Sequence, residues 1–109
     1  MVKQKYMKMI RGIKNNTAKV WSVYVLRCGD NTFYTGIAKD VVQRVRLHNK
    51  GCGAVYTKTH LPVRLLYSEG PLNRSEALIR EAQIKRLSRP QKEILVASDR
   101  AEVLPIRHA

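Results

Sequence analysis

Two segments near the start of the chain, Val20–Cys28 and Thr32–Ala38, are rich in β-branched and aromatic residues. Such runs are typical of β-strands. The residues between them, Gly29-Asp30-Asn31, favour a tight turn because these residue types adopt the backbone angles that turns require. The pattern therefore predicts a β-hairpin.

A helix is predicted directly after this hairpin. Asp40 followed by Gln43 is a capping-box pattern, so the helix should begin at residue 41. Arg44 and His48 then lie one turn apart along the helix edge. The core-facing stripe would consist of Val41, Val42 and Val45.

The next segment, Lys50–Leu61, contains two glycines and no hydrophobic period, which predicts a loop. Pro62 then opens a third strand over Val63–Ser68, where apolar residues alternate. Gly70-Pro71 is expected to break the chain after that strand.

The following helix should begin with Asn73 or Ser75 as its cap and end near Leu87. Its apolar arc is formed by Ala77, Leu78 and Ile84. Glu81 falls inside this arc, and a carboxylate among apolar neighbours needs a partner. That partner could be Lys85 at i+4, or Glu81 could serve as a metal ligand or in a buried network.

A last helix is predicted from the capped start Ser88-Arg89-Pro90-Gln91 to about Ala97. Its docking residues would be Ile94, Leu95 and Val96. The complete pattern indicates an α+β fold, a small three-stranded antiparallel sheet flanked by helices in the order β-β-α-β-α-α.

The composition points to a polyanionic partner. The 109 residues suffice for one domain, and 21 Lys and Arg against 8 Asp and Glu give a net charge of +13. We expect a domain over residues 20–97, a basic flexible arm over 1–19 and a tail over 98–109. The arm could add phosphate contacts or form a short amphipathic helix, or the natural start could be Met7 or Met9.

Two cysteines, Cys28 and Cys52, form neither a CxxC motif nor a disulfide framework. A zinc site would have to recruit His48 and His60 at spacings unlike those of paired zinc ligands. No apolar run approaches membrane-spanning length. We therefore expect a cytoplasmic protein, a monomer, with reduced thiols and no membrane segment.

Two tyrosines ten positions apart, Tyr24 and Tyr34, precede an arginine ten further on and a histidine four beyond that. This constellation resembles the GIY-YIG nuclease domain and most resembles its small stand-alone bacterial (YhbQ-like) members. Ser22-Val23-Tyr24 stands in the place of Gly-Ile-Tyr, and Tyr34-Thr35-Gly36 in the place of Tyr-Ile-Gly. The similarity continues to about Val96.

The resemblance implies metal-dependent hydrolysis of DNA, and suggests branched or damaged structures in repair as substrates. It places Arg44 on the catalytic arginine of the family and His48 on a position that is often histidine. Glu81 matches the metal-binding glutamate. RNA is not excluded as a substrate, and a protein partner for targeting stays open.

The residue chemistry is compatible with that reading. Asp30 is accounted for by the turn and Asp40 by the helix cap, which leaves Glu81 as the acid without a structural explanation. One carboxylate suggests one divalent ion, Mg²⁺ or alternatively Mn²⁺, which keeps several waters. Arg44 suits phosphoryl charge because its guanidinium is a planar fork.

Other side chains receive supporting roles. Tyr34 is the candidate general base, Tyr24 would orient the water or share that role, and His48 would contact phosphate or relay a proton. Candidate nucleic-acid contacts are Tyr56, Thr57, Lys58 and Lys85.

Two alternatives to an enzyme remain at this stage: a nucleic-acid-binding module on the same scaffold, and a basic structural or ribosome-associated protein. Geometry offers a first test. With a two-residue loop, Tyr24 and Tyr34 would point to opposite faces of the sheet. A shared site therefore predicts an odd-length connection or a bulge between them.

Overall fold

The computed structural model describes residues 17–103, with side chains described as far as residue 98. Most of the predicted arm and the last six residues of the predicted tail lie outside this range. Three antiparallel strands form one sheet in the order β2-β1-β3: β1 (Trp21–Arg27), β2 (Phe33–Ala38) and β3 (Arg64–Leu72).

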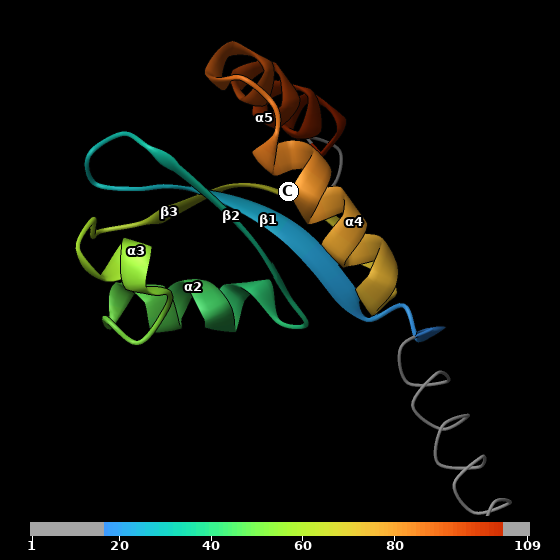
Figure 1. Ribbon diagram of the computed structural model, residues 1–109, viewed down its shortest axis with the longest axis horizontal. Helices are drawn as coiled ribbons and strands as arrows, with labels where there is room; N and C mark the ends of the chain where they lie inside the picture. Colours follow the sequence, from blue (N-terminus) through green and yellow to red (C-terminus); the bar gives the residue numbers. More distant parts are fainter. Residues whose placement is uncertain (1–16, 104–109) are drawn as a thin grey trace, which may run out of the picture.

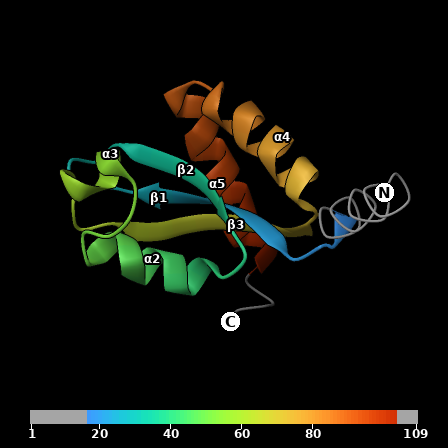
Figure 2. The same cartoon turned by 60° about the horizontal axis from the view of Figure 1, so that its bottom comes forward.

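Helices cover both faces of this sheet (Figures 1 and 2). One face carries α2 (Val41–Asn49) and the single-turn α3 (Val55–Lys58). The other carries α4 (Arg74–Lys85) and α5 (Arg89–Val103). The predicted α+β fold and element order are confirmed, but α3 lies within the segment that was expected to be a loop.

The hairpin turn owes its shape to side chains that bond their own backbone. The Asp30 carboxylate accepts hydrogen bonds from the Thr32 amide at 3.2 Å and from the Thr32 hydroxyl at 2.6 Å. Asn31 adopts a positive φ of 72°. The connection runs over positions 28–32, an odd number, and pairs Tyr24 with Gly36 and Leu26 with Tyr34. Both tyrosines therefore point to the same face, as a shared site requires.

The third strand is longer than predicted. It continues through Gly70-Pro71 and ends at Leu72, so this dipeptide does not break the chain. Gly70 has φ +157°, and a Cβ atom there would lie 2.8 Å from the Trp21 carbonyl oxygen and 2.7 Å from Ser22 Oγ. Glycine thus lets β3 pass very close to the start of β1, where the pairing register also shifts.

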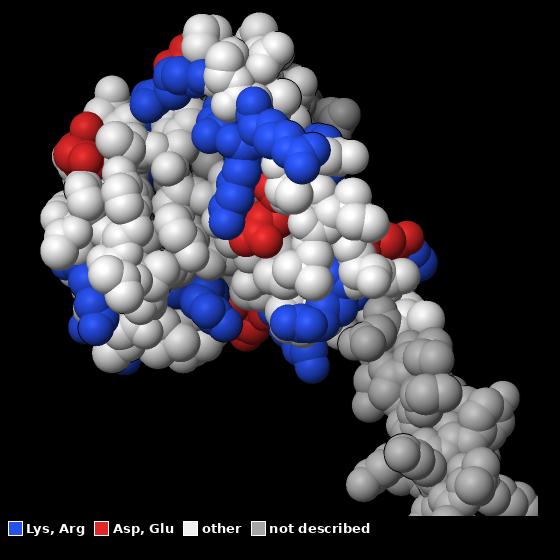
Figure 3. All heavy atoms as spheres, viewed as in Figure 1, with Lys and Arg blue, Asp and Glu red and all other residues white. Residues whose placement is uncertain are grey.

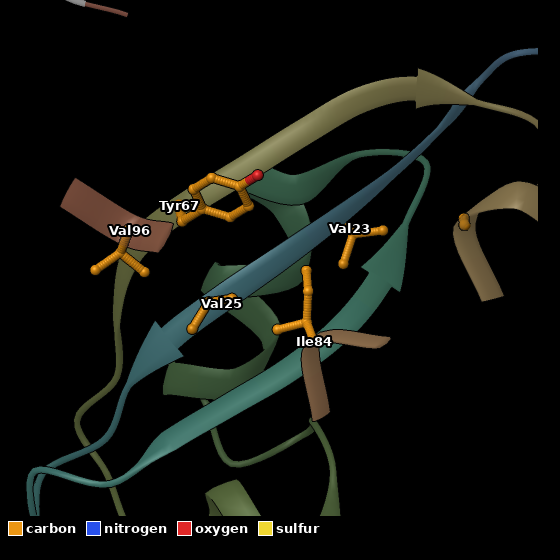
Figure 4. Close-up of a cluster of buried hydrophobic side chains, with 6 residues drawn as sticks. Val23, Val25, Tyr67, Ile84 and Val96 are labelled. Carbon is orange, nitrogen blue, oxygen red and sulfur yellow. The ribbon is translucent and has the colours of Figure 1, made fainter. Parts of the chain in front are cut away.

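Two buried clusters fill the space on either side of the sheet. The cluster under α4 and α5, drawn in Figure 4, consists of Val23, Val25, Tyr67, Ala77, Ile84 and Val96. The cluster under α2 consists of Tyr24, Leu26, Cys28, Ala38 and Val63. Residues at odd positions of β1 face α4 and α5, whereas residues at even positions face α2, as the period of a strand dictates.

The buried stripe of α2 differs from the prediction. Val41 and Val45 pack against the core, but Val42 is 58% exposed. The next buried position of the stripe is His48, which is 1% exposed rather than at the helix edge. Spacings of i, i+4 and i+7 place these three residues on one face, and Val42 lies a full helical step away from it.

The two C-terminal helices also correct the prediction in detail. Leu78 and Ile94 are exposed, at 41% and 70%, although both were expected to face the core. Of the two residues predicted as the cap of α4, Asn73 is the one that the structure uses. The last helix continues to Val103, so the predicted tail begins inside α5 and only residues 104–109 lie beyond it.

A capping box begins α4 and makes a stability prediction. The Asn73 side chain accepts a hydrogen bond from the Glu76 amide at 2.8 Å, and the Glu76 carboxylate accepts one from the Asn73 amide at 2.9 Å. Asn73→Ala should lower the free energy of unfolding by about 1 kcal/mol in urea titrations. Ser75→Ala, an exposed change in the same turn, should alter it by less than about 0.5 kcal/mol. Equal losses in both variants would contradict a specific cap.

Candidate active site

Three aromatic rings meet on the α2 face of the sheet. The ring centroids of Tyr24 and Tyr34 lie 6.4 Å apart, those of Tyr24 and His48 6.0 Å apart, and those of Tyr34 and His48 5.3 Å apart. The Tyr24 hydroxyl lies 3.0 Å from His48 Nε2. Strand pairing supplies the two tyrosines and α2 supplies the histidine.

A chain of hydrogen bonds fixes the protonation of this group. The Thr57 hydroxyl donates to the Ala54 carbonyl at 2.9 Å, so its single proton is used. Since Thr57 Oγ1 also lies 2.7 Å from His48 Nδ1, the imidazole must donate from Nδ1. In the neutral ring Nε2 is then an acceptor, and it receives the hydrogen bond from the Tyr24 hydroxyl.

Burial acts in the same direction. Tyr24 and His48 are each 1% exposed. Burial raises the pKa of the Tyr24 phenol, and Tyr34 and Glu81 add to that rise while Arg44 opposes it. Burial and the neighbouring Arg44 charge lower the pKa of His48. Both groups are therefore uncharged at neutral pH, in agreement with the hydrogen-bond pattern.

Two glycines make room for these rings. A Cβ atom at Gly36 would lie 2.6 Å from the Tyr24 hydroxyl oxygen and 2.8 Å from its Cζ, and one at Gly53 would collide with His48 Nδ1. Gly51 ends α2 with φ +79°, where its amide bonds the His48 carbonyl at 2.9 Å. This helix ending leads the chain back so that Gly53 lies over the imidazole.

Charged groups flank the rings from the two helical layers. Arg44 is exposed on α2, one turn before His48, and Glu81 is on α4 with a side chain 19% exposed. Both charges lie close enough to Tyr24 to influence its pKa. The Glu81 carboxylate forms an ion pair with Lys85 at 3.4 Å. The structure therefore brings Tyr24, Tyr34, Arg44, His48 and Glu81 into one region.

The donor set can hold a divalent ion only loosely. Among the described residues, no group of three or more His, Cys, Asp or Glu side chains could enclose a metal ion. Glu81 offers one partly exposed carboxylate, and its ion-pair partner Lys85 is 55% exposed. A hard ion such as Mg²⁺, which keeps most of its waters, fits a single oxygen ligand of this kind.

Two predicted contacts need correction because the side chains are buried. Thr57 is 0% exposed and holds His48, so its hydroxyl does not face a nucleic-acid strand. His48 is likewise shielded from any phosphate. Neither the Thr57–His48 bond nor the place of Gly53 over the imidazole could be predicted from local patterns, since both depend on how the segment after α2 folds back.

The other predicted nucleic-acid contacts stay at the surface. Tyr56 is 39% exposed, but its ring is stacked on His60 with centroids 4.1 Å apart, and its hydroxyl lies 2.6 Å from Thr32 Oγ1. Lys58 is exposed at the end of α3. Lys85 is engaged with Glu81, whereas Lys58 forms no ion pair with a carboxylate of the described residues.

Comparison with known proteins decides the family. The GIY-YIG catalytic domain matches residues 20–94 of the chain. This protein belongs to the GIY-YIG family. Within that family it is similar to the UPF0213 protein of Staphylococcus epidermidis, 53% identical over 70 residues, which cover 64% of this chain and 85% of the relative. The UPF0213 protein of Halobacterium salinarum is 52% identical over 73 residues, with coverage of 67% and 95%.

A solved relative agrees with the fold. The solution NMR structure of the protein EF2693 from E. faecalis is 38% identical, with a TM-score of 0.51 and coverage of 76% of this chain and 88% of that one. These matches confirm the small stand-alone GIY-YIG group, and the family supports a nuclease-type function. None of the described helices is long and apolar enough to cross a membrane.

Charged side chains are unevenly distributed over the surface of this GIY-YIG domain. Figure 3 shows basic side chains gathered over the end of α4 and the start of α5, and others over α2. A small acidic patch lies between these two basic areas. A strand of nucleic acid across this face would meet positive charge on both sides of the acidic patch.

The buried His48 predicts how stability depends on pH. Its folded-state pKa is lowered, so below about pH 6.5 the unfolded chain takes up a proton that the folded chain does not. Between that pH and pH 8, the His48 contribution to the free energy of unfolding should be constant. Below about pH 6.5 it should decrease with a slope of at most about 1.4 kcal/mol per pH unit.

Urea titrations between pH 5 and 8 measure this slope. His48→Gln removes the titrating ring and should flatten the dependence, at a cost of about 1–3 kcal/mol at pH 8 from the disturbed hydrogen bonds. His60→Gln, a change in a partly exposed histidine that faces Asp30, should leave the His48 slope in place. If the free energy of unfolding still decreases below about pH 6.5 in His48→Gln, the proton taken up on unfolding belongs to another group.

Proposed function

We propose that this protein is a metal-dependent endonuclease that hydrolyses phosphodiester bonds in DNA, with branched or damaged structures as its substrates. The supporting observation is the hydrogen-bonded Tyr24–His48–Thr57 chain, which holds Tyr24 beside the Tyr34 ring and within electrostatic reach of Arg44 and Glu81. The net charge of +13 suits a phosphate-rich substrate.

In the proposed reaction, a water oxygen forms a bond to phosphorus and the bond to the 3′ oxygen breaks. Tyr34, acting as a phenolate, is assigned to receive the proton from the attacking water, because it is the tyrosine of the cluster that is only partly buried. The 3′ oxygen leaves with the bonding electron pair and takes a proton from solvent. Arg44 is assigned to the phosphoryl oxygens, where its planar fork balances the charge that develops.

Tyr24 and His48 have a positioning role in this proposal. The Tyr24 proton is directed at His48 Nε2, and burial raises the phenol's pKa, so Tyr24 is poorly suited to act as a base. Its ring fixes the place of the Tyr34 ring beside it. His48, held through Nδ1 by Thr57, is a neutral acceptor that orients the Tyr24 hydroxyl.

Glu81 is the residue that would hold a divalent ion, Mg²⁺ or Mn²⁺. When bound, the ion would neutralise charge on the phosphate and on the leaving 3′ oxygen. Glu81 is partly exposed, and its ion pair with Lys85 is of the weak i,i+4 kind, so the carboxylate can exchange that partner.

A non-catalytic binding module is the second candidate. The observation that favours it is the Glu81–Lys85 ion pair, which gives the carboxylate a purely structural partner. The first motif triplet, Ser22-Val23-Tyr24, also lacks the glycine and isoleucine of the family name. On this alternative the same surface would bind DNA without cutting it.

Substitution of Glu81 separates the two candidates. Glu81→Gln keeps the shape and removes the charge, so the rate of cleavage of labelled flap, fork, four-way and duplex DNA with Mg²⁺ or Mn²⁺ should fall at least about 100-fold. DNA affinity should stay equal or rise, because one negative charge near phosphate is lost. The companion variant Lys85→Met leaves the Glu81 carboxylate in place, so it should keep the cleavage rate at saturating DNA and change stability by less than about 0.5 kcal/mol.

Two results would contradict the enzyme proposal. One is a Glu81→Gln protein that cleaves normally and still needs the metal. The other is a loss of thermal stability in both variants, with an unchanged rate per folded molecule, which would mark Glu81 and Lys85 as a structural pair.

The salt dependence of binding tests how far phosphate contacts dominate. Affinity for DNA of different sequences should fall steeply between 50 and 200 mM salt, and the slope of log K against log salt should reflect the number of neutralised phosphates. Deletion of residues 1–19, most of which lie outside the described part, should flatten the slope if the arm contacts phosphate. An unchanged slope would show that the arm makes no phosphate contact.

A further inference from the structure

A groove of about 240 Å³ opens beside Arg44, where β1 begins and β2 ends. It is lined by Trp21, Ala38, Lys39, Asp40, Gln43, Arg44 and Leu47. The Asp40 carboxylate accepts a hydrogen bond from the Gln43 amide as the cap of α2. This volume is below the roughly 300–1,000 Å³ of pockets for drug-sized ligands, so the groove suits one small planar group. Arg44 belongs both to this groove and to the surroundings of the Tyr24–His48 pair.

Trp21 forms an aromatic wall held in a fixed place. Part of its indole packs against the hydrophobic core under α4 and α5, which anchors the ring. Two cations lie over the ring, Lys39 Nζ at 5.4 Å and Arg74 Cζ at 5.5 Å from its centroid. In the part of the chain that the structure describes, neither cation is in an ion pair with a carboxylate. A base that stacks on the indole would take the place of one of these cations, which could then contact a phosphate.

The other lining residues match the same ligand. Leu47 is partly exposed and offers an apolar surface to the flat face of a base, while the buried Ala38 closes the floor of the groove. Gln43 is exposed and carries an amide that can donate to and accept from a base edge. Lys39 and Arg44 at the rim can contact the phosphates on either side of the bound nucleotide.

We propose that this groove binds one unpaired DNA base, stacked on Trp21, next to the phosphate that Arg44 contacts. The inference rests on the proposed function and names its substrate class: DNA with an unpaired nucleotide beside the cleaved bond. A base held within a duplex cannot enter, because its faces are stacked on its neighbours. Flaps, forks and bubbles are then bound better than continuous duplex.

The chain contains one tryptophan, so intrinsic fluorescence reports on this groove directly. Full-length protein without added metal and with EDTA would be titrated with a short oligothymidylate, with an abasic oligomer of equal length and with blunt duplex. We expect saturable quenching with oligothymidylate and little with the other two. This measurement needs no variant, so it stands even if substitutions at Trp21 impair folding.

Affinity measurements with labelled DNA complete the test. Trp21→Leu should weaken single-strand binding about 5- to 100-fold and duplex binding less than about twofold, with Trp21→Phe between wild type and Leu. The matched control is Phe33→Leu, an aromatic loss at the other end of the sheet, where Arg89 Cζ lies 3.9 Å from the ring centroid. It should leave single-strand affinity unchanged.

The outcomes separate this inference from the proposed function. Equal quenching by the abasic oligomer, or equal affinity losses for single strand and duplex in Trp21→Leu, would overturn the base site. A second result would also overturn the base site: Trp21 fluorescence does not change when oligothymidylate is added, although cleavage depends on Glu81. The nuclease proposal would survive that result. Selective quenching in a protein that does not cleave would support the base site on a binding module.

Discussion

The buried hydrogen bond between the Tyr24 hydroxyl and His48 Nε2 is the interaction on which the arrangement of this domain depends. It ties the central strand to α2, and the bond from His48 to Thr57 extends the tie to α3. A buried polar group without a hydrogen-bond partner costs about 1–3 kcal/mol of stability. Loss of any one bond of this chain would therefore leave a buried polar group of its neighbour without a partner. Gly36 and Gly53 follow from the same constraint, since both leave space for its rings.

The chain of bonds also explains how a protein of net charge +13 can have an uncharged interior at its candidate site. Tyr24 and His48 stay neutral because burial penalises their charged forms. The formal charges, Arg44 and Glu81, lie further toward solvent on two different helices. The neutral interior is rigid and the charged groups lie at its rim. This arrangement is preorganised, because the charged groups can act on a phosphate without reorganising the core.

Local signals in the sequence predicted much of this fold. The Asp40 cap and the spacing of Tyr24 and Tyr34 depend on neighbours in the chain, and the structure agrees with them. Longer-range features were out of reach. Thr57 reads as a loop residue until the Gly51 turn brings it against His48, and Gly70 reads as a break until β1 lies beside it. Local sequence patterns do not predict which separate segments of the chain will contact each other.

The pairing of β1 with β2, rather than the length of the turn, puts the two tyrosines on one face. Paired residues lie on the same face of a sheet, and Tyr34 pairs with Leu26 while Gly36 pairs with Tyr24. A residue inserted into the turn over positions 28–32 can be absorbed there and leaves these pairs intact. A slip of one residue in the pairing itself would turn Tyr34 toward α4 and α5 and would keep every letter of both motif triplets. The register of two strands, which no motif records, therefore separates a domain with a common tyrosine face from one that only has the letters.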